Sequence, residues 1–129
     1  MSVSYLVDTS VLILSLKAIG DIRQRLDRLP ITYMSAITLG ELSYGAEHSV
    51  NVEKSFIEVD SLIKVSTVLI ADSETARIYG QIKHIQARKG QMLPDNDLWI
   101  AATALQHGLT LIARDNHFSW ISELTLEQW

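Results

Sequence analysis

The sequence predicts one α/β domain over residues 1–129, with a mostly parallel sheet of four to five strands and helices on both faces. Short runs rich in β-branched residues alternate with longer runs of helical periodicity along the chain. Such alternation requires crossover connections, and crossover connections produce parallel strands. The length of 129 residues suits one domain with its own core and is too short for two.

The first part of the chain predicts two strands with two helices between them. Residues 3–8 (VSYLVD) predict the first strand, and residues 9–17 (TSVLILSLK) follow at once as a helix. Residues 21–29 (DIRQRLDRL) place apolar side chains at helical spacing, and Pro30 ends that helix. Residues 31–35 (ITYMS) then predict the second strand.

The middle of the chain predicts two more helices and a third strand. Ser35 is a favourable N-cap residue for a helix over residues 36–48 (AITLGELSYGAEH). Residues 51–64 (NVEKSFIEVDSLIK) gather apolar side chains, Ile63 among them, on one face and so predict an amphipathic helix. Residues 65–70 (VSTVLI) predict the third strand.

The C-terminal part continues the alternation. A long helix is predicted over residues 72–90, where a glycine ends it. The stretch LPDNDLWIAATAL begins at Leu93 and predicts an apolar helix that ends at Gly108. Residues 109–113 (LTLIA) predict the fourth strand, and after a turn residues 124–127 (LTLE) predict a short fifth.

Composition limits the class of protein. The chain is 47% apolar and 20% charged, which is ordinary for a globular domain. We expect no membrane span and no signal peptide, since no apolar run is long enough and the start lacks a basic region. The absence of cysteine excludes disulfides and thiolate metal sites and favours a cytoplasmic location. A net charge of −4 argues mildly against nucleic acid, although acids concentrated in one site produce the same balance.

Acidic residues occupy four places that a parallel sheet can bring together. Asp8 follows the first predicted strand and Asp115 follows the fourth. In such sheets the functional crevice lies at the carboxyl ends of the strands. Glu41 lies among apolar and small residues of its helix, and Asp97 lies on the stripe of its helix that should face the interior.

Each acid also has a structural explanation. Asp8 can cap the helix that follows it, and Asp115 can be a turn residue in RDNH. Glu41 can form a capping box if its helix begins at Thr38. Asp97 can stabilise the helix dipole from the first turn. Taken one at a time, the four acids do not decide between a structural and a functional role. Only their combination argues for a functional site.

The combination of four acids points to a divalent cation. Two carboxylates about 4 Å apart repel each other by about 4 kcal/mol at an effective dielectric of about 20. A cluster is therefore tolerable only with protons, basic partners or a cation. Oxygen ligands without cysteine or paired histidine suit Mg²⁺ or Mn²⁺ rather than Zn²⁺. Such ions commonly serve in the hydrolysis of phosphate esters.

Four segments together carry a family resemblance: YLVDTSVLI, ITLGELSYG, PDNDLWIAATAL and LTLIARDNHF. In this order and spacing they resemble a PIN-domain ribonuclease, and more closely the VapC-type toxins of toxin–antitoxin pairs. The resemblance spans Tyr5 to about Ile121. It implies a three-layer α/β/α sandwich around the parallel sheet.

The resemblance also implies the site residues. The catalytic and metal-binding acids would be Asp8, Glu41, Asp97 and Asp115. Supporting positions beside them would be Thr9 and Ser10. Asp95 is an extra acid that the family pattern does not account for, and we expect it to cap its helix and to support the site from beside it. The family often has threonine where this chain has Ala113, so a hydroxyl near the fourth acid is missing.

The activity that the resemblance implies is that of a metal-dependent endoribonuclease toxin. Water activated by carboxylate-bound Mg²⁺ or Mn²⁺ would attack an RNA phosphodiester. Contacts to the RNA phosphates are expected from Arg114, Arg88 and Lys89. A cognate VapB-like antitoxin would inhibit the enzyme. The chain would form a homodimer, contact no membrane and meet DNA only through the antitoxin.

A second interpretation keeps the fold and changes the activity. The chain would be a catalytically weak PIN-fold binding module that acts with an antitoxin-like DNA-binding regulator. The four acids argue against this interpretation, because a pure scaffold has no reason to tolerate their repulsion. A phosphatase of the haloacid dehalogenase type is excluded, because Ser10 stands where its second aspartate is required.

Overall fold

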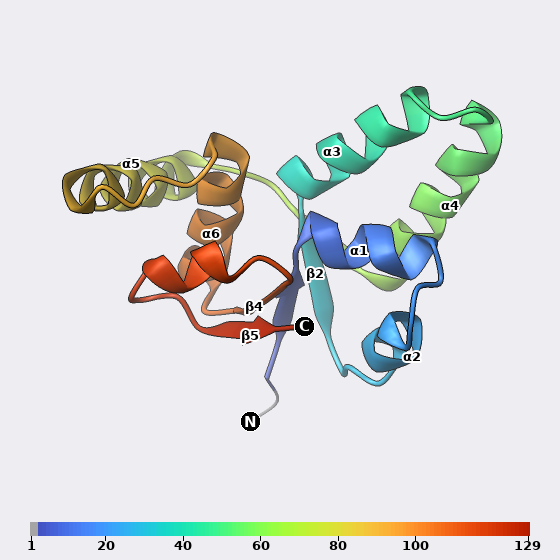
Figure 1. The fold of residues 1–129 in the computed structure, drawn as a ribbon, viewed down its shortest axis with the longest axis horizontal. Coiled ribbons are helices and arrows are strands. Elements are labelled where there is room, and N and C mark those ends of the chain that lie inside the picture. Colours follow the sequence, from blue (N-terminus) through green and yellow to red (C-terminus); the bar gives the residue numbers. More distant parts are fainter. Residues whose placement is uncertain (1–2) are drawn as a thin grey trace.

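The computed structural model describes residues 3–129 and has a parallel five-stranded sheet at its centre (Figure 1). The strands are β1 (Tyr5–Val7), β2 (Thr32–Ser35), β3 (Thr67–Leu69), β4 (Thr110–Ala113) and β5 (Leu126–Gln128). They lie in the order β3-β2-β1-β4-β5, and every neighbouring pair is parallel. The predicted α/β class, the parallel sheet and the short fifth strand are confirmed.

Helices connect these strands and cover both faces of the sheet. Within residues 3–129 they are α1 (Thr9–Leu16), α2 (Ile22–Asp27), α3 (Ala36–Glu47), α4 (Val52–Val65), α5 (Ser73–Lys89), α6 (Asp95–His107) and a 3₁₀ helix, η1 (Asn116–Trp120). In Figure 1, α5 and α6 lie to one side of the sheet and α1 to α4 lie to the other.

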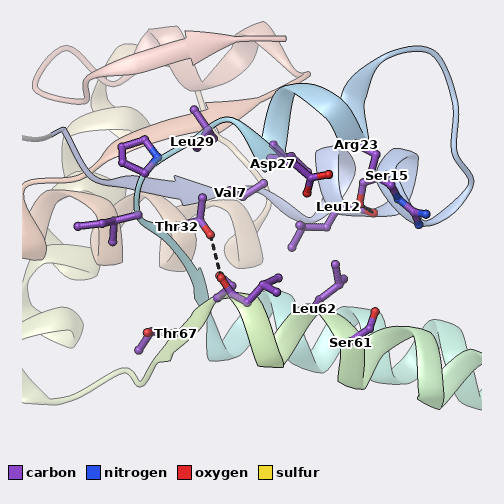
Figure 2. Close-up of a pocket in the computed structure, with 15 residues that line it drawn as sticks. Val7, Leu12, Ser15, Arg23, Asp27, Leu29, Thr32, Ser61, Leu62 and Thr67 are labelled. Atoms are coloured by element: carbon purple, nitrogen blue, oxygen red, sulfur yellow. Dashed lines mark hydrogen bonds between the residues drawn. The ribbon is translucent and has the colours of Figure 1, made fainter.

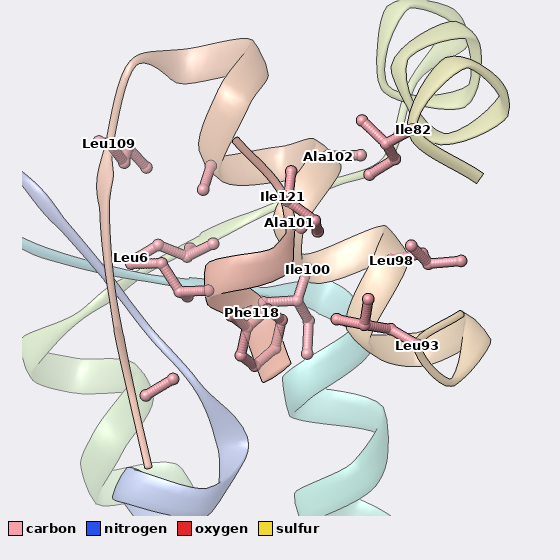
Figure 3. Packing of buried hydrophobic residues seen from close by; sticks show 13 residues of the cluster. Leu6, Ile82, Leu93, Leu98, Ile100, Ala101, Ala102, Leu109, Phe118 and Ile121 are labelled. Atoms are coloured by element: carbon pink, nitrogen blue, oxygen red, sulfur yellow. The ribbon is translucent and has the colours of Figure 1, made fainter. Parts of the chain in front are cut away.

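Alternate strand residues pack into two separate apolar clusters, one for each face. Leu6 and Leu111 contribute to the cluster beneath α5 and α6, which Figure 3 shows from close by. Val7 and Ile112, one residue further along each strand, contribute to the cluster beneath α1, α2, α3 and α4. The sheet is therefore the middle layer of a three-layer sandwich, because strand side chains alternate between its faces.

Helix α6 lies close to the sheet because its inner face is made of small side chains. Ala101, Ala102 and Ala104 are each 0% exposed, and Ile100 is fully buried beside them. The helix ends at Gly108, whose φ of 64° is the left-handed conformation that glycine adopts without strain.

Two local expectations were wrong. The third strand covers Thr67–Leu69 rather than residues 65–70, because only these three residues pair with β2. The preceding helix α4 runs on to Val65, and Ile70 is exposed. Ile63, expected on the apolar face of α4, is 38% exposed because Phe56, Val59 and Leu62 make the contacts with the core.

Candidate active site

Strand pairing brings two of the four acids to the same edge of the sheet. Val7 pairs with Ile112, so the carboxyl ends of β1 and β4 are adjacent. Asp8 follows β1 directly, and its backbone N–H donates to the carbonyl of Ile112 at 2.8 Å. Asp115 lies two residues beyond the end of β4. Both therefore lie at the edge of the sheet where parallel α/β domains bind ligands.

Asp8 is held at the start of α1 by Ser10. Its Oδ2 accepts hydrogen bonds from the backbone N–H of Ser10 at 3.2 Å and from the Ser10 hydroxyl at 2.6 Å. Both bonds are made to Oδ2, which leaves Oδ1 able to accept a further ligand. Burial raises the pKa of Asp8, and the Glu41 carboxylate adds to this, while the hydrogen bonds from Ser10 partly oppose it. The aspartate is thus a helix cap and a buried carboxylate at once.

Glu41 lies on α3 and is oriented by α1. The Thr9 hydroxyl donates to Glu41 Oε1 at 2.7 Å, and the hydroxyl oxygens of Thr9 and Thr38 are 3.0 Å apart. The capping-box alternative is excluded, because α3 begins at Ala36 and is capped by Ser35. The half-buried Glu41 carboxylate is therefore fixed by a neighbouring helix, not by the start of its own.

Asp97 is the third residue of α6 and is half buried. Burial raises its pKa to about 6, and the negative charges of Asp8, Glu41 and Asp115 contribute in that order, while His117 opposes them. Because all three other acids act on this group, the four carboxylates share one electrostatic environment. The pKa of Asp97 is thus shifted towards neutral pH.

Asp115 caps the 3₁₀ helix that follows β4. Its Oδ1 accepts a hydrogen bond from the backbone N–H of His117 at 2.8 Å and lies 3.0 Å from Nδ1 of the same residue. The His117 ring in turn lies against Trp120, with ring centroids 4.5 Å apart. Ala113, at the position where a threonine was expected from the family, is fully buried in the cluster beneath α6.

A cavity of about 520 Å³ joins these groups. It is lined by Asp8, Thr9, Ser10, Ile13, Glu41, Asp97, Arg114, Asp115 and Phe118. All four predicted acids, Thr9, Ser10 and the predicted phosphate contact Arg114 therefore face one pocket. Sequence reasoning did not find Ile13 and Phe118, whose apolar side chains give no chemical signal.

The donor set is of the kind that binds a hard divalent cation. It consists of carboxylate and hydroxyl oxygens, and burial together with the charges of the other acids raises the pKa of Asp97, a penalty that a cation would relieve. Among residues 3–129, however, no three His, Asp or Glu side chains lie close enough together to hold one ion as they are oriented. Binding a cation thus requires the carboxylates to turn towards one another within the pocket.

Asp95 does not belong to this pocket and does not cap α6. The N-cap position is Pro94, and Asp95 is the first helical residue. Its Oδ1 accepts hydrogen bonds from the Tyr79 hydroxyl at 2.8 Å and from Lys83 Nζ at 2.9 Å. The expectation of a cap was wrong because a side chain on α5 holds the carboxylate instead.

The three predicted RNA contacts are not placed alike. Arg114 lines the acidic pocket, directly before Asp115. Arg88 and Lys89 are the exposed last two residues of α5 and do not line the pocket. Only Arg114 is therefore positioned to share a phosphate with the acids.

Sequence reasoning missed two polar neighbours of the acids. Thr38 is fully buried and bonds to Thr9, and it was considered only as part of a capping box. His117 is the second, since a histidine two residues after a turn aspartate can fold back onto it. Thr38 acts on the site through the Thr9 hydroxyl, and His117 acts on it through the Asp115 carboxylate.

A second cavity, of about 560 Å³, lies at the amino ends of β2 and β3 (Figure 2). Thr32 and Thr67 mark those ends, and Leu12, Leu29 and Leu62 form much of its wall. Its wall includes none of the four predicted site acids. This cavity therefore does not compete with the acidic pocket as a place for phosphate chemistry.

Residues 5–124 match the family described as PIN domain, and the chain belongs to that family. A tRNA(fMet)-specific endonuclease VapC of Salmonella typhimurium is 33% identical over 128 residues, covering 97% of both chains. Ribonuclease VapC2 of Haemophilus influenzae is 28% identical over 131 residues, again covering 97% of both. The crystal structure of DNA-bound VapBC from Salmonella typhimurium aligns with a TM-score of 0.90 at 32% identity, covering 98% of each chain. The resemblance to VapC proteins is confirmed.

No helix within residues 3–129 combines the length and the apolar character that crossing a membrane requires.

Proposed function

We propose that this chain is a metal-dependent endoribonuclease that acts as the toxin of a toxin–antitoxin pair. The observation that carries the proposal is the pocket that gathers four carboxylates from four separate segments, three of which raise the pKa of the fourth, Asp97. A fold has no structural need to gather four acids in this way, because their mutual repulsion and burial are costly. The names of its relatives, which are ribonucleases and endonucleases, support the same activity.

Asp8, Glu41 and Asp97 would hold Mg²⁺ or Mn²⁺, with Asp115 as a fourth ligand. When bound, such an ion neutralises phosphate charge and makes water more acidic, which is the chemistry that cleavage of a phosphodiester requires. Ser10 fixes the rotamer of Asp8, and Thr9 holds one oxygen of Glu41, so that the second oxygens can turn into the pocket. Below its raised pKa, Asp97 holds a proton that the cation must displace.

RNA would be held over the pocket by Arg114. Arg114 is exposed and lines the same pocket as the four acids, and the planar donors of arginine match a phosphate group. A phosphate that binds Arg114 would lie within the same cavity as the four acids. The scissile bond, and not a distant part of the RNA, would then lie beside the carboxylates.

The inhibitor would be a VapB-like antitoxin. Structures of VapBC from Haemophilus influenzae and from Salmonella typhimurium have been solved, the latter bound to DNA. In this chain an apolar cavity of about 260 Å³ lies between α1, α3 and α4 and shares Ile13 and Glu41 with the acidic pocket. An antitoxin segment that filled this cavity could place a basic side chain among the acids. The chain would reach DNA only through such a partner, and we also propose that it forms a homodimer.

The alternative of a weakly catalytic binding module has one observation in its favour. Within residues 3–129, no three acids lie close enough together in their present orientation to hold one ion. If the carboxylates never converge, the pocket would serve only to receive the basic group of a partner. Metal binding separates the two functions, because the binding module needs none.

The deciding experiment is cleavage of a pool of small cellular RNAs by the purified chain with Mg²⁺, with Mn²⁺ and with EDTA. Asp97→Asn is the test variant, and Asp60→Asn, an exposed acid on α4, is the matched control. Discrete products with metal from the wild type and Asp60→Asn, absent with EDTA and with Asp97→Asn, would establish the enzyme. Measurable Mn²⁺ binding without any cleavage product would indicate an enzyme whose RNA target is too narrow to be present in the pool. Absence of both would favour the binding module.

A further inference from the structure

The first turn of α6 carries Asp97 but lacks the cap that usually holds a first turn in place. The N-cap residue is Pro94, whose side chain makes no capping hydrogen bond. The first amide groups of a helix have no partner within the helix, and without a side-chain acceptor this turn frays. A frayed first turn would leave the direction of the Asp97 carboxylate undetermined.

Helix α5 supplies a restraint through two polar groups, the Lys83 ammonium and the Tyr79 hydroxyl. Lys83 Nζ lies 2.9 Å from Asp95 Oδ1 and 3.1 Å from the Tyr79 hydroxyl, which itself donates to Asp95 Oδ1 at 2.8 Å. The Tyr79 ring also stacks on Trp99, with centroids 4.2 Å apart and planes 11° from parallel. One residue of α5 thus contacts α6 both at its first residue and one turn later.

The contacts from α5 act on one side of α6, and Asp97 lies on another side. Residues four positions apart share a helix face, so Asp95 and Trp99 both face α5. Asp97 is two positions from Asp95, about 200° around the axis, and it lines the acidic pocket. Holding Asp95 and Trp99 therefore sets the rotation of the first turn and with it the direction of Asp97.

We propose that Lys83 and Tyr79 are positioning residues for the active site, which hold Asp97 in its direction through Asp95 and Trp99. The inference rests on the proposed function, since it assumes that Asp97 binds the cation. It also explains an acid that the family pattern left as an extra one. Asp95 serves the site from outside the pocket.

Lys83→Met tests this inference because two explanations predict changes of opposite sign. If Lys83 acts only as a charge, its removal makes the surroundings of the acids more negative and tightens cation binding. If Lys83 positions Asp97, its removal weakens cation binding, by about tenfold as is typical for groups that orient metal ligands. Tyr79→Phe keeps the ring on Trp99 and removes only the hydroxyl, so it should weaken binding by a smaller factor without any change of charge.

The readout is Mn²⁺ affinity of the whole chain by calorimetry, together with hydrogen exchange of residues 93–100 in the metal-free protein. Arg77→Met is the matched control, because Arg77 is exposed on the same helix and takes no part in these contacts. Lys83→Arg should restore both affinity and protection. We expect faster exchange and weaker Mn²⁺ binding in Lys83→Met and in Tyr79→Phe, with neither change in Arg77→Met.

Two failures are distinguishable. If the wild type binds Mn²⁺, Asp97→Asn does not, and Lys83→Met binds as tightly as the wild type or more tightly, then the positioning role is wrong and the proposed site stands. If the wild type binds Mn²⁺ no better than Asp97→Asn, then the proposed metal site is wrong, and the positioning role fails with it whatever the exchange shows.

Discussion

Thr9 on α1 and Glu41 on α3 are joined by a 2.7 Å hydrogen bond between two helices that begin at the ends of neighbouring strands. A carboxylate only accepts, so the single hydroxyl hydrogen of Thr9 is used on Glu41. The hydroxyl of Thr38, 3.0 Å from that of Thr9, must then donate to Thr9. A buried relay of two hydroxyls therefore orients a half-buried acid.

Thr9→Val should release Glu41 while keeping the size and branching of the side chain. We expect Mn²⁺ affinity to fall about tenfold, since groups that orient metal ligands have effects of this order. The free energy of unfolding should fall by about 1 to 2 kcal/mol, because the buried Thr38 hydroxyl loses its acceptor. Thr9→Ser retains the hydroxyl and is the control for both calorimetry and denaturant unfolding. Wild-type metal affinity in Thr9→Val would show that the relay does not orient Glu41.

Asp97→Asn should abolish cleavage and stabilise the metal-free chain at neutral pH. The pKa of Asp97 is raised from 3.8 to about 6, so its ionised form is disfavoured in the folded state. A full shift of this kind would correspond to about 3 kcal/mol, and because the side chain is half exposed we expect about 1 kcal/mol. Thermal unfolding in EDTA should show a midpoint higher by about 3 to 5 °C. A lower midpoint would contradict the charge repulsion in the pocket.

The same shift predicts how stability depends on pH. A carboxyl whose folded pKa is raised contributes stability that is present in full below its unfolded pKa of 3.8 and is lost as pH rises through about 6. The advantage of Asp97→Asn over the wild type should therefore be small near pH 4 and reach its full size above about pH 6.5. Unfolding in EDTA across this range tests it, with Asp60→Asn as a control that should follow the wild type.

Cation binding should depend on pH in the opposite sense. Protons compete with the cation for Asp97, so Mn²⁺ affinity and kcat/KM for RNA should both fall as the pH drops below about 6. Mn²⁺ should also raise the thermal midpoint of the wild type at about pH 7.5, and leave that of Asp97→Asn unchanged. Equal midpoint shifts in the two proteins would place the cation elsewhere.

Arg114→Ala should weaken RNA binding and leave Mn²⁺ affinity intact or slightly improved, because a cation is removed from the pocket wall. Arg88→Ala and Lys89→Ala remove equal charges from the end of α5, outside the pocket, and should change RNA binding much less. Binding of labelled small RNA at several salt concentrations provides the measurement. Equal losses in all three variants would indicate a broad electrostatic surface, not a contact at the scissile phosphate.

The elements that the sequence predicted well are those in which local pattern and topology agree. Strand alternation and crossovers lead to a parallel sheet, and the rule for carboxyl ends then places Asp8 and Asp115 together. Glu41 and Asp97 were predictable because an acid on the apolar face of a helix is costly to bury unless it has a partner or a ligand. In each case the inference needed only spacing along one element and the order of elements.

The elements that the sequence did not predict depend on contacts between helices. Asp95 has the spacing of a cap, and only the packing of α5 against α6 shows that Lys83 holds it. The relay from Thr38 through Thr9 depends in the same way on how α1 lies against α3. No periodicity within a single segment encodes such pairs, since they depend on how two segments pack.

The order of the strands has a consequence for how the chain is made. Tyr5 of β1 pairs with Thr110 of β4, so the central strand gains its second neighbour only after more than 100 further residues have left the ribosome. Asp97 and Asp115 emerge at the same late stage, after the segments that carry Asp8 and Glu41. A chain that has been synthesised only as far as α5 contains Asp8 and Glu41 but neither Asp97 nor Asp115, so the acidic pocket is not yet complete. Any hydrolytic capacity of this domain can therefore begin only after residue 115 has been synthesised, which gives a binding partner time to be present.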